Sequence, residues 1–501
     1  MDQLEAPAAR RTTVVGLAAL GVLVVAGGAF VGPEIALAGA FAIAAGAVLA
    51  MREMATPTVT WPNAVAAFLL VVWFIPAKGY RLPVSLPFNL EPYRLALALI
   101  LVVLLVAVLT GRAQLEYLGF GVPLALLAGG ATVSALLNYD RIGDLPGETG
   151  AFRSLSYFLG FLAVFVLIAS TIKTHDGLDT AARAIVIGAS LAALSALYES
   201  RSGYNVFIHL DEWIPALVRE ERATFDVRGG NLRVFASAQH PIALSCALFM
   251  SIPLAVYLIG RASSQARARL WIAAALICAL GAVATISRTT VIMGLALLLV
   301  GFWLRRNEIL RYWPLLFLLP IVIHFATPGA LGGIYYAFFP REGLAGDLAS
   351  RQGEAGSGRL ADVEPGIRLW EQAPIFGKSV GAQYTTGEAQ IGTLAEGVQG
   401  VIIYFDNQWL NTLVSLGVVG LVATFWFVWG SFGSIARFAR RVRGPRSDLA
   451  AACAASVAAF GVSMLVFDAF AFVQATIIFF AIAAIGLQAR RLGPRPVDLA
   501  D

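Results

Sequence analysis

A single charge interrupts a long apolar stretch of the chain. Arg288 lies between residues 270–287 and 289–304, and no other charged residue occurs in that run. A charge is costly inside a membrane segment and by default indicates a functional site. Arginine suits a phosphate because its planar guanidinium binds two oxygens at once and keeps its charge. We therefore predict that Arg288 binds an anionic group at a membrane surface.

A second arginine, Arg233, lies just before the boundary Ser237-Ala-Gln-His240-Pro241. Ser237 is typical of a helix N-cap, and Pro241 suits the first turn of the helix that follows. A helix N-terminus beside an arginine is an anion-binding site. We expect Arg233 and Arg288 to approach one another on one membrane face. His240 is a candidate substrate-binding residue there, with helix capping or packing as the commoner role of a lone histidine.

Asp406-Asn407-Gln408 precedes a further apolar segment that begins near Trp409. Aspartate and asparagine at a helix start are good caps, which is one interpretation of this pair. The other is catalytic, because a carboxylate can accept a proton from a hydroxyl. An ordinary aspartate pKa of about 4 makes it a weak base unless that pKa is raised.

The segment 328–406 is too long for a simple connection, and such loops are usually functional or disordered. Within it, residues 359–371 have the spacing of a short amphipathic helix. That helix would lie on the membrane surface or cap a helix bundle. The residues predicted to share its apolar face are Leu360, Val363, Ile367 and Trp370.

The composition defines the class of protein. Hydrophobic residues make up 58% of the chain and charged residues 13%, which excludes an ordinary soluble domain. The apolar runs are near 20 residues rather than alternating decamers, so we predict an all-α, polytopic membrane helix bundle. Twelve to fourteen spans are expected, the first of them an uncleaved anchor. They lie near 12–31, 33–51, 61–77, 94–110, 115–137, 154–172, 177–198, 240–260, 270–287, 289–304, 312–327, 407–431, 449–467 and 469–488.

One set of basic residues in the connections falls at a single parity of the span count, which predicts that these connections are cytoplasmic. The set is Arg10, Arg11, Arg52, Arg112, Lys173, Arg261, Arg267, Arg269, Arg305, Arg306, Arg311, the cluster from Arg437 to Arg446, Arg490, Arg491 and Arg495. Arg288 and the loops near 199–239 and 328–406 would then be outside. We expect a bundle at 1–327, a large extracytoplasmic loop at 328–406, and C-terminal spans with a cytoplasmic tail at 407–501. The net charge of +5 does not indicate a nucleic-acid partner. No phosphate-cradling glycine motif indicates a built-in ATPase, and the three cysteines fall within spans, so no metal or disulfide framework is implied.

These residues resemble the O-antigen ligase and polymerase family of bacterial polysaccharide assembly, over roughly residues 220–430. The resemblance rests on Arg233 with Phe235-Ala-Ser-Ala-Gln-His-Pro241, on Ser287-Arg288 between two spans, and on the large outer loop. That loop carries Arg359, Arg368-Leu-Trp, Pro374-Ile-Phe-Gly377 and Gly381, then Asp406-Asn407-Gln408-Trp409-Leu410 and Leu416-Gly417-Val-Val-Gly420-Leu421.

The resemblance implies a glycosyltransferase at the outer face of the cytoplasmic membrane, without a cofactor or required metal. Its partners would be an undecaprenyl-pyrophosphate-linked glycan, an acceptor glycan, membrane lipid and other polysaccharide assembly proteins. Arg233 and Arg288 would hold the pyrophosphate, and Asp406 would be the base. The auxiliary substrate contacts would come from Arg359, Arg368, His240, Asn407, Gln408, Tyr384 and Trp370, with packing as the commoner role of the two aromatic residues.

The chain departs from the ligases at one position. A ligase has a histidine immediately before the asparagine at the end of the large loop, and here that residue is Asp406. The Asp-Asn-Gln version resembles the polymerase and exopolysaccharide branch of the family. The alternatives are an O-antigen ligase that transfers the glycan to a lipid core, a lipid-linked oligosaccharide flippase or transporter, and a structural partner of an assembly complex.

Overall fold

The chain folds into a bundle of long helices with very little sheet. The computed structural model describes residues 60–84, 90–139, 148–220, 226–228, 231–311, 335, 363–382, 384–385, 402–403 and 405–493. Within these ranges the long helices are α3 (Trp61–Phe74), α4 (Pro92–Leu109), α5 (Gly121–Leu137), α7 (Glu148–Thr171), α8 (His175–Ser202), α10 (Pro241–Gly260), α11 (Gln265–Ala284), α12 (Arg288–Arg311), α18 (Gln408–Arg441), α19 (Pro445–Ser463) and α20 (Val473–Leu492).

Short elements connect these helices. They are η1 (Val206–His209), α9 (Leu210–Trp213), α16 (Val363–Glu371) and η2 (Ala469–Ala471). Three antiparallel strand pairs join β1 (Tyr80–Arg81) to β2 (Val218–Arg219), β3 (Asp226–Arg228) to β4 (Asn231–Arg233), and β5 (Tyr384–Thr385) to β6 (Ile402–Ile403).

The predicted all-α membrane bundle is confirmed. Among the described residues, eight helices are long and apolar enough to cross a membrane, and α3 and α5 are shorter apolar helices. Eleven predicted spans overlap helices of the structure. The spans predicted at 12–31, 33–51 and 312–327 lie outside the described residues. Helix α18 is longer than the span predicted at 407–431, because it continues through its arginine-rich segment to Arg441.

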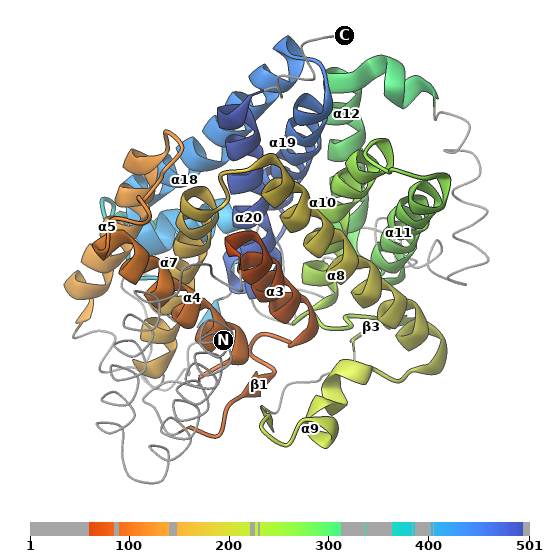
Figure 1. Cartoon of the computed structure of the whole chain (residues 1–501). Coiled ribbons are helices and arrows are strands. Elements are labelled where there is room, and N and C mark those ends of the chain that lie inside the picture. The colour runs from red at the N-terminus through yellow and green to blue at the C-terminus, as the bar shows by residue number, and fades with distance from the viewer. Residues whose placement is uncertain are drawn as a thin grey trace, which may run out of the picture.

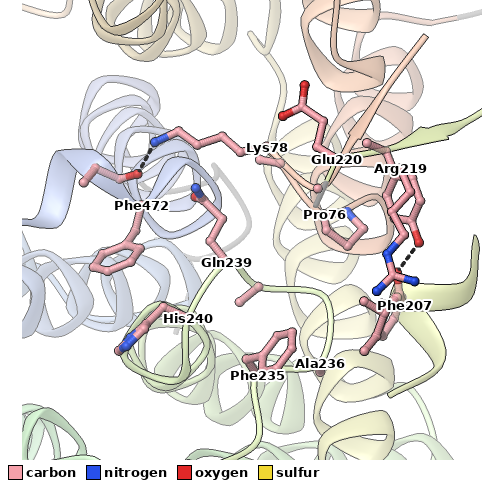
Figure 2. Close-up of a pocket in the computed structure, with 16 residues that line it drawn as sticks. Pro76, Lys78, Phe207, Arg219, Glu220, Phe235, Ala236, Gln239, His240 and Phe472 are labelled. Atoms are coloured by element: carbon pink, nitrogen blue, oxygen red, sulfur yellow. Dashed lines mark hydrogen bonds between the residues drawn. The ribbon is translucent and has the colours of Figure 1, made fainter. Parts of the chain in front are cut away.

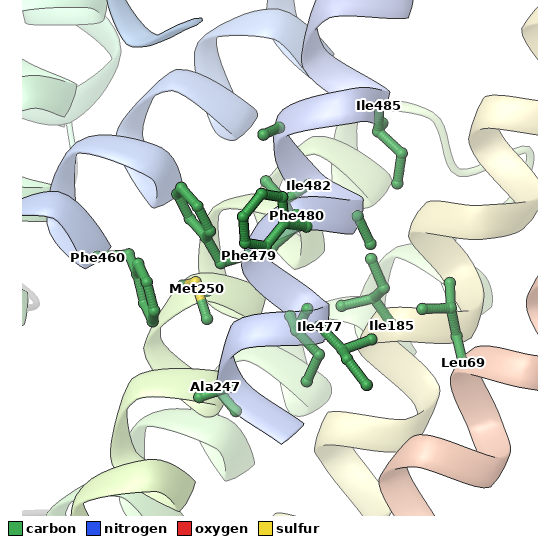
Figure 3. Close-up of a cluster of buried hydrophobic side chains, with 14 of the residues drawn as sticks. Leu69, Ile185, Ala247, Met250, Phe460, Ile477, Phe479, Phe480, Ile482 and Ile485 are labelled. Atoms are coloured by element: carbon green, nitrogen blue, oxygen red, sulfur yellow. The ribbon is translucent and has the colours of Figure 1, made fainter. Parts of the chain in front are cut away.

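Helix α20 forms the centre of the bundle. It packs against α7, α8, α10, α18 and α19, and 94% of the residues in its apolar 18-residue stretch are buried. Figure 3 shows its Phe479 and Phe480 beside Phe460 of α19, and the Phe460 and Phe479 rings stack with their centroids 4.4 Å apart. Neighbouring helices therefore surround α20 on all sides, as is typical of a helix in the core of a large protein. The alanine-rich sequence of α19 allows its neighbours to approach closely.

The two ends of the bundle differ in chemistry. One end, named the strand end, carries β1, α9 and β3 (Figure 1), and the opposite end, named the basic end, carries the last turn of α20 with Arg490 and Arg491. At the basic end Arg491 contacts Glu116 at 2.7 Å, and Arg305 contacts Asp448 at 3.1 Å. The first contact joins the end of α20 to the segment before α5, and the second joins α12 to the start of α19.

A buried ion network holds the basic end together. The Asp179 carboxylate of α8 accepts hydrogen bonds from Arg446 of α19 at 3.2 Å and from the Tyr257 hydroxyl of α10 at 2.6 Å. Asp179 is 3% exposed and Arg446 is 1% exposed. Three helices therefore meet at one charge pair shielded from solvent.

The turn between α11 and α12 spans only residues 285–287. The spans predicted at 270–287 and 289–304 leave only Arg288 between them, and the structure has a correspondingly sharp turn. The helices themselves diverge, since α11 packs on α8 and α10, whereas α12 packs mainly on α19 and α10. Arg288 thus begins a helix whose position is set by the core.

Helix α18 is broken at Gly417, where φ is +65°. The segment around Gly377 enters this break. The Val418 N–H donates to the Pro374 carbonyl at 2.9 Å, and the Lys378 N–H donates to the Val414 carbonyl at 2.9 Å. A Cβ on Gly417 would lie 2.2 Å from the Ile375 oxygen, so only glycine fits. Two sequence motifs far apart in the chain are therefore one structural unit.

Candidate active site

Arg233 and the turn before Arg288 are in contact at the strand end. Arg233 ends β4, is 3% exposed, and donates from Nε to the Thr285 carbonyl at 3.3 Å. Arg288, three residues further along the turn, is the half-buried first residue of α12. The approach predicted from sequence therefore brings the two arginines to one small region.

Buried hydroxyl groups fix the start of α12. The Thr290 hydroxyl lies 2.7 Å from the Ser245 hydroxyl of α10 and donates to the Ala282 carbonyl of α11 at 3.3 Å. These contacts join three helices two residues after Arg288, so they fix the position of the first turn of α12.

The backbone is strained beside both arginines. Ile286 has φ of +48° and Ala236 has φ of +45°, in the left-handed region that residues with a Cβ rarely adopt. Strain of this kind persists only where the surroundings impose it, and it is common at functional sites. The two strained residues lie two positions before Arg288 and three positions after Arg233.

Residues 233–241, named the motif loop, are held by buried polar groups. The Glu199 carboxylate accepts hydrogen bonds from the Ala236 N–H at 2.8 Å and the Phe235 N–H at 3.4 Å. The Asn205 side chain donates to the Ala236 carbonyl at 3.1 Å. Sequence reasoning missed Glu199, although an acidic residue near the end of an otherwise apolar span is itself a signal.

The start of α20 also holds the motif loop. The Gln474 amide donates to the Ser237 hydroxyl at 3.3 Å and to the Val72 carbonyl at 3.1 Å. Gln239 accepts a hydrogen bond from the Val473 N–H at 2.7 Å. The loop is therefore positioned by helices from both halves of the chain, a relation that no local sequence pattern indicates.

The predicted N-cap of α10 is wrong. His240, and not Ser237, holds that position, and its Nδ1 accepts a hydrogen bond from the Ile242 N–H at 3.1 Å. Pro241 is the first helical residue, which fixes the cap at the residue before it. The His240 ring also stacks on Phe472 with centroids 5.4 Å apart. His240 therefore caps and packs, while one side of it lines a cavity.

That cavity, named the loop cavity, has a volume of about 290 Å³. Figure 2 shows its walls, which come from the segment after α3, from η1 and β2, from the motif loop, and from the segment before α20. Its polar lining includes Lys78, Arg219, Glu220, Gln239 and His240. No sequence motif indicates a role for Lys78.

Lys78 connects the loop cavity to an ion network at the strand end. Its Nζ donates to the Ala471 carbonyl at 2.9 Å, and its N–H donates to the Glu91 carboxylate at 3.0 Å. The fully buried Glu91 also accepts from Arg153 at 2.8 Å, and Arg153 contacts Glu220 at 3.3 Å. Opposite charges alternate here, so the network fixes one wall of the cavity.

Asp468 is a carboxylate that sequence reasoning missed. It lies between α19 and α20, with its Oδ1 atom buried. Burial raises the pKa of Asp468 from 3.8 to about 6, and the nearby Asp406 raises it too. Hydrogen bonds from the Asn411 side chain and the Ala471 N–H, together with Lys78, act in the opposite direction. The available signal was an aspartate alone between two predicted spans.

Asp406 lies at the surface immediately before α18. Asn407 is the N-cap, and its side-chain oxygen accepts from the Trp409 N–H at 2.9 Å and the Leu410 N–H at 3.2 Å. The buried Gln408 accepts from the Phe470 N–H at 2.6 Å and donates to the Thr412 hydroxyl at 3.0 Å. Asn407 and Gln408 thus shape the helix start that presents Asp406 beside Asp468.

The predicted amphipathic helix is present as α16, but its predicted apolar face is wrong. Val363 is 41% exposed, whereas Leu369 is fully buried and Gly366 packs against Leu410 of α18. Contact with the start of α18 selects the face on which the small glycine allows close approach. The packing contacts place α16 against α18.

The structure describes some of the substrate contacts predicted in the large loop. Arg368 is exposed and hydrogen-bonded to Glu364. Trp370 is half-buried and donates to the Pro374 carbonyl at 3.1 Å. Tyr384 lies in β5, and only its backbone is described. Arg359 lies outside the described residues. Across the described ranges, no three His, Cys, Asp or Glu side chains gather as a metal site would require.

A comparison with protein families gives one match. Residues 247–425 match the family described as O-Antigen ligase. This segment contains Arg288, α16, the Gly377–Gly417 contact and Asp406, whereas Arg233, Lys78 and Asp468 lie outside it. No curated protein sequence matches the chain. The resemblance found in the sequence is confirmed over the matched segment.

Proposed function

We propose that this protein, which carries an O-antigen ligase domain at residues 247–425, transfers a glycan from a polyprenyl-pyrophosphate donor to an acceptor sugar hydroxyl. The strand end would face outward, because the arginine-rich connections lie at the opposite end and such loops are normally cytoplasmic. The donor would be undecaprenyl-pyrophosphate-linked, with its tail in the bilayer of the inner membrane.

The observation that carries this proposal is the contact between Arg233 and the turn before Arg288. Two guanidinium groups in one partly buried region can offset the charge that develops on a departing pyrophosphate. Their attraction for that charge is greater there than in water, because the effective dielectric constant is lower. Arginines in this role make a metal ion unnecessary for the reaction that we propose.

The proposed reaction is a displacement with inversion. The acceptor hydroxyl oxygen forms a bond to the anomeric carbon, the bond from that carbon to the pyrophosphate oxygen breaks, and its electron pair leaves with the pyrophosphate. The hydroxyl proton passes to a carboxylate. Asp406 occupies the position where ligases carry a histidine, and the neighbouring Asp468 has a pKa raised to about 6, which suits a base near neutral pH. We assign the two as a carboxylate pair.

The substitution of aspartate for the ligase histidine favours polymerisation over transfer to a lipid core. In that case the acceptor is another lipid-linked chain. Arg359, Arg368, Trp370 and Tyr384 remain proposed contacts to the glycan, and Asn407, Gln408 and His240 act mainly by shaping the site.

Transport of the intact lipid-linked glycan across the membrane is the alternative function. The break of α18 at Gly417 is a feature of helices in transporters. The segment 374–379 fills that break and bonds to both of its sides, which favours a fixed structural role over an opening path.

Purified protein in lipid nanodiscs with an undecaprenyl-pyrophosphate oligosaccharide would test the proposal. We expect wild type to release undecaprenyl pyrophosphate and lengthen the glycan. Arg288→Ala should lose at least 100-fold of this activity while folding normally. Arg269→Ala, an exposed arginine of α11, is the matched control and should retain it. A protein that moves the intact glycan across vesicle membranes without transfer would refute the proposal in favour of a flippase.

A further inference from the structure

The loop cavity combines surfaces that suit a carbohydrate ring. Phe207, Phe235 and Phe472 contribute aromatic surface, and Lys78 and Gln239 contribute polar groups. Figure 2 shows the Gln239 amide between Lys78 and His240. The Gln239 side-chain oxygen accepts a hydrogen bond from the Val473 N–H at 2.7 Å. This bond orients the amide, so its NH₂ group is directed away from Val473. Apolar walls with a few oriented polar groups are typical of small-molecule sites.

The size of the loop cavity limits its occupant. Its volume is about 290 Å³. This lies at the lower end of the range for pockets that hold drug-sized ligands. One sugar ring fits this volume, whereas an oligosaccharide or a polyprenyl chain would extend beyond it.

Residues that line the loop cavity lie near an arginine and near a carboxylate. The lining residue Phe235 is two positions from Arg233. The lining residue Lys78 bonds to Ala471 and lies near Asp468. Neither Arg233 nor Arg288 lines the cavity. In an inverting displacement the acceptor enters opposite the leaving group, so the acceptor and its base belong on the side away from the pyrophosphate.

We propose that the loop cavity binds the terminal sugar ring of the acceptor glycan, with the Gln239 NH₂ group donating to a ring hydroxyl. This inference rests on the proposed function. Phe472 and Phe235 would cover apolar faces of the ring, and Lys78 would orient it towards Asp468. The cavity would thus select the acceptor, while Arg233 and Arg288 bind the donor.

Two substitutions separate acceptor binding from donor binding. Ala238→Leu enlarges a buried side chain that lines the cavity. Gln239→Glu keeps an oxygen for the Val473 N–H but removes the NH₂ donor. We expect each to raise the acceptor KM at least tenfold and to leave the Kd for undecaprenyl pyrophosphate within twofold of wild type. Ala266→Leu, at an exposed position of α11, is the control and should change neither value.

Saturation-transfer NMR with free glucose, galactose and N-acetylglucosamine provides a readout that does not depend on turnover. We expect wild type to bind at least one of them and Ala238→Leu to lose that binding. If wild type transfers glycan but neither substitution changes the acceptor KM, the cavity is not the acceptor site and the proposed function stands. If the donor Kd rises tenfold instead, the cavity belongs to the donor. If wild type binds sugar but does not transfer, the proposed function fails together with the acceptor assignment.

Discussion

Replacing Asp468 with asparagine should stabilise the protein above pH 6 and remove its transfer activity. The pKa of this carboxyl rises from 3.8 to about 6, chiefly because burial penalises the charged form. One pKa unit corresponds to about 1.4 kcal/mol, so ionised Asp468 costs the folded state up to about 3 kcal/mol at neutral pH. Because the folded-state pKa is raised, the favourable contribution is complete below about pH 4 and is lost as the pH rises through about 6.

The assay is the free energy of unfolding in dodecyl sulfate titrations between pH 4 and 8. Asp468→Asn should match wild type at pH 4 and exceed it progressively, by up to about 3 kcal/mol, at pH 8. Glu371→Gln, an exposed carboxylate of α16, is the control and should show no such divergence. A difference between Asp468→Asn and wild type that stays constant over this range would refute the reasoning.

Activity supplies the second half of the same prediction. Transfer by wild type should rise as the pH passes about 6, since only ionised Asp468 accepts a proton. Asp468→Asn should lower transfer by at least about 100-fold, the usual range for loss of a general base. Asp406→Asn removes a like charge, so the rise should move to lower pH. An unchanged pH profile in Asp406→Asn would mean that the two carboxylates do not act as a pair.

Three further substitutions test other parts of the structure. Asp179→Ala leaves Arg446 buried without its carboxylate and should destabilise the protein by about 3–5 kcal/mol. The double variant Asp179→Leu with Arg446→Met removes both charges and should be more stable in dodecyl sulfate than Asp179→Ala. Equal stability of the two variants would show that the unpaired charge of Arg446 is not the cause of the loss. Gly417→Ala places a Cβ 2.2 Å from the Ile375 oxygen at a φ of +65°, so we expect a lower melting temperature. Gly433→Ala on the same helix is the control: its Cβ meets nothing within 4 Å, and the melting temperature should not change. Glu199→Leu removes the acceptor for two N–H groups of the motif loop and should cost about 1–3 kcal/mol and reduce donor binding through Arg233; full donor binding in this variant would show that Glu199 does not position the loop.

The sequence determined the class of the protein because the hydrophobic length of a span and the cost of an intramembrane charge are local properties. Composition and run length predicted the helices, and the isolated Arg288 indicated a site. Pro241 correctly indicated the start of α10. The N-cap predicted at Ser237 was wrong, because in the structure His240 holds that position. The family resemblance could be found because its motifs are short and occur in a fixed order.

Only the tertiary structure decided which side chains meet. The contact of Gly377 with the break at Gly417, and the buried face of α16, depend on segments about 40 residues apart in the chain. Asp468 has a raised pKa because neighbouring segments bury it, bringing Asp406 near it and Lys78 from the other end of the chain. Desolvation and distance between charges are properties of packing, whereas a sequence specifies only residue type and order. The sequence therefore determined what kind of protein this is, and the packing decided which carboxylates and which cavity accompany the two arginines.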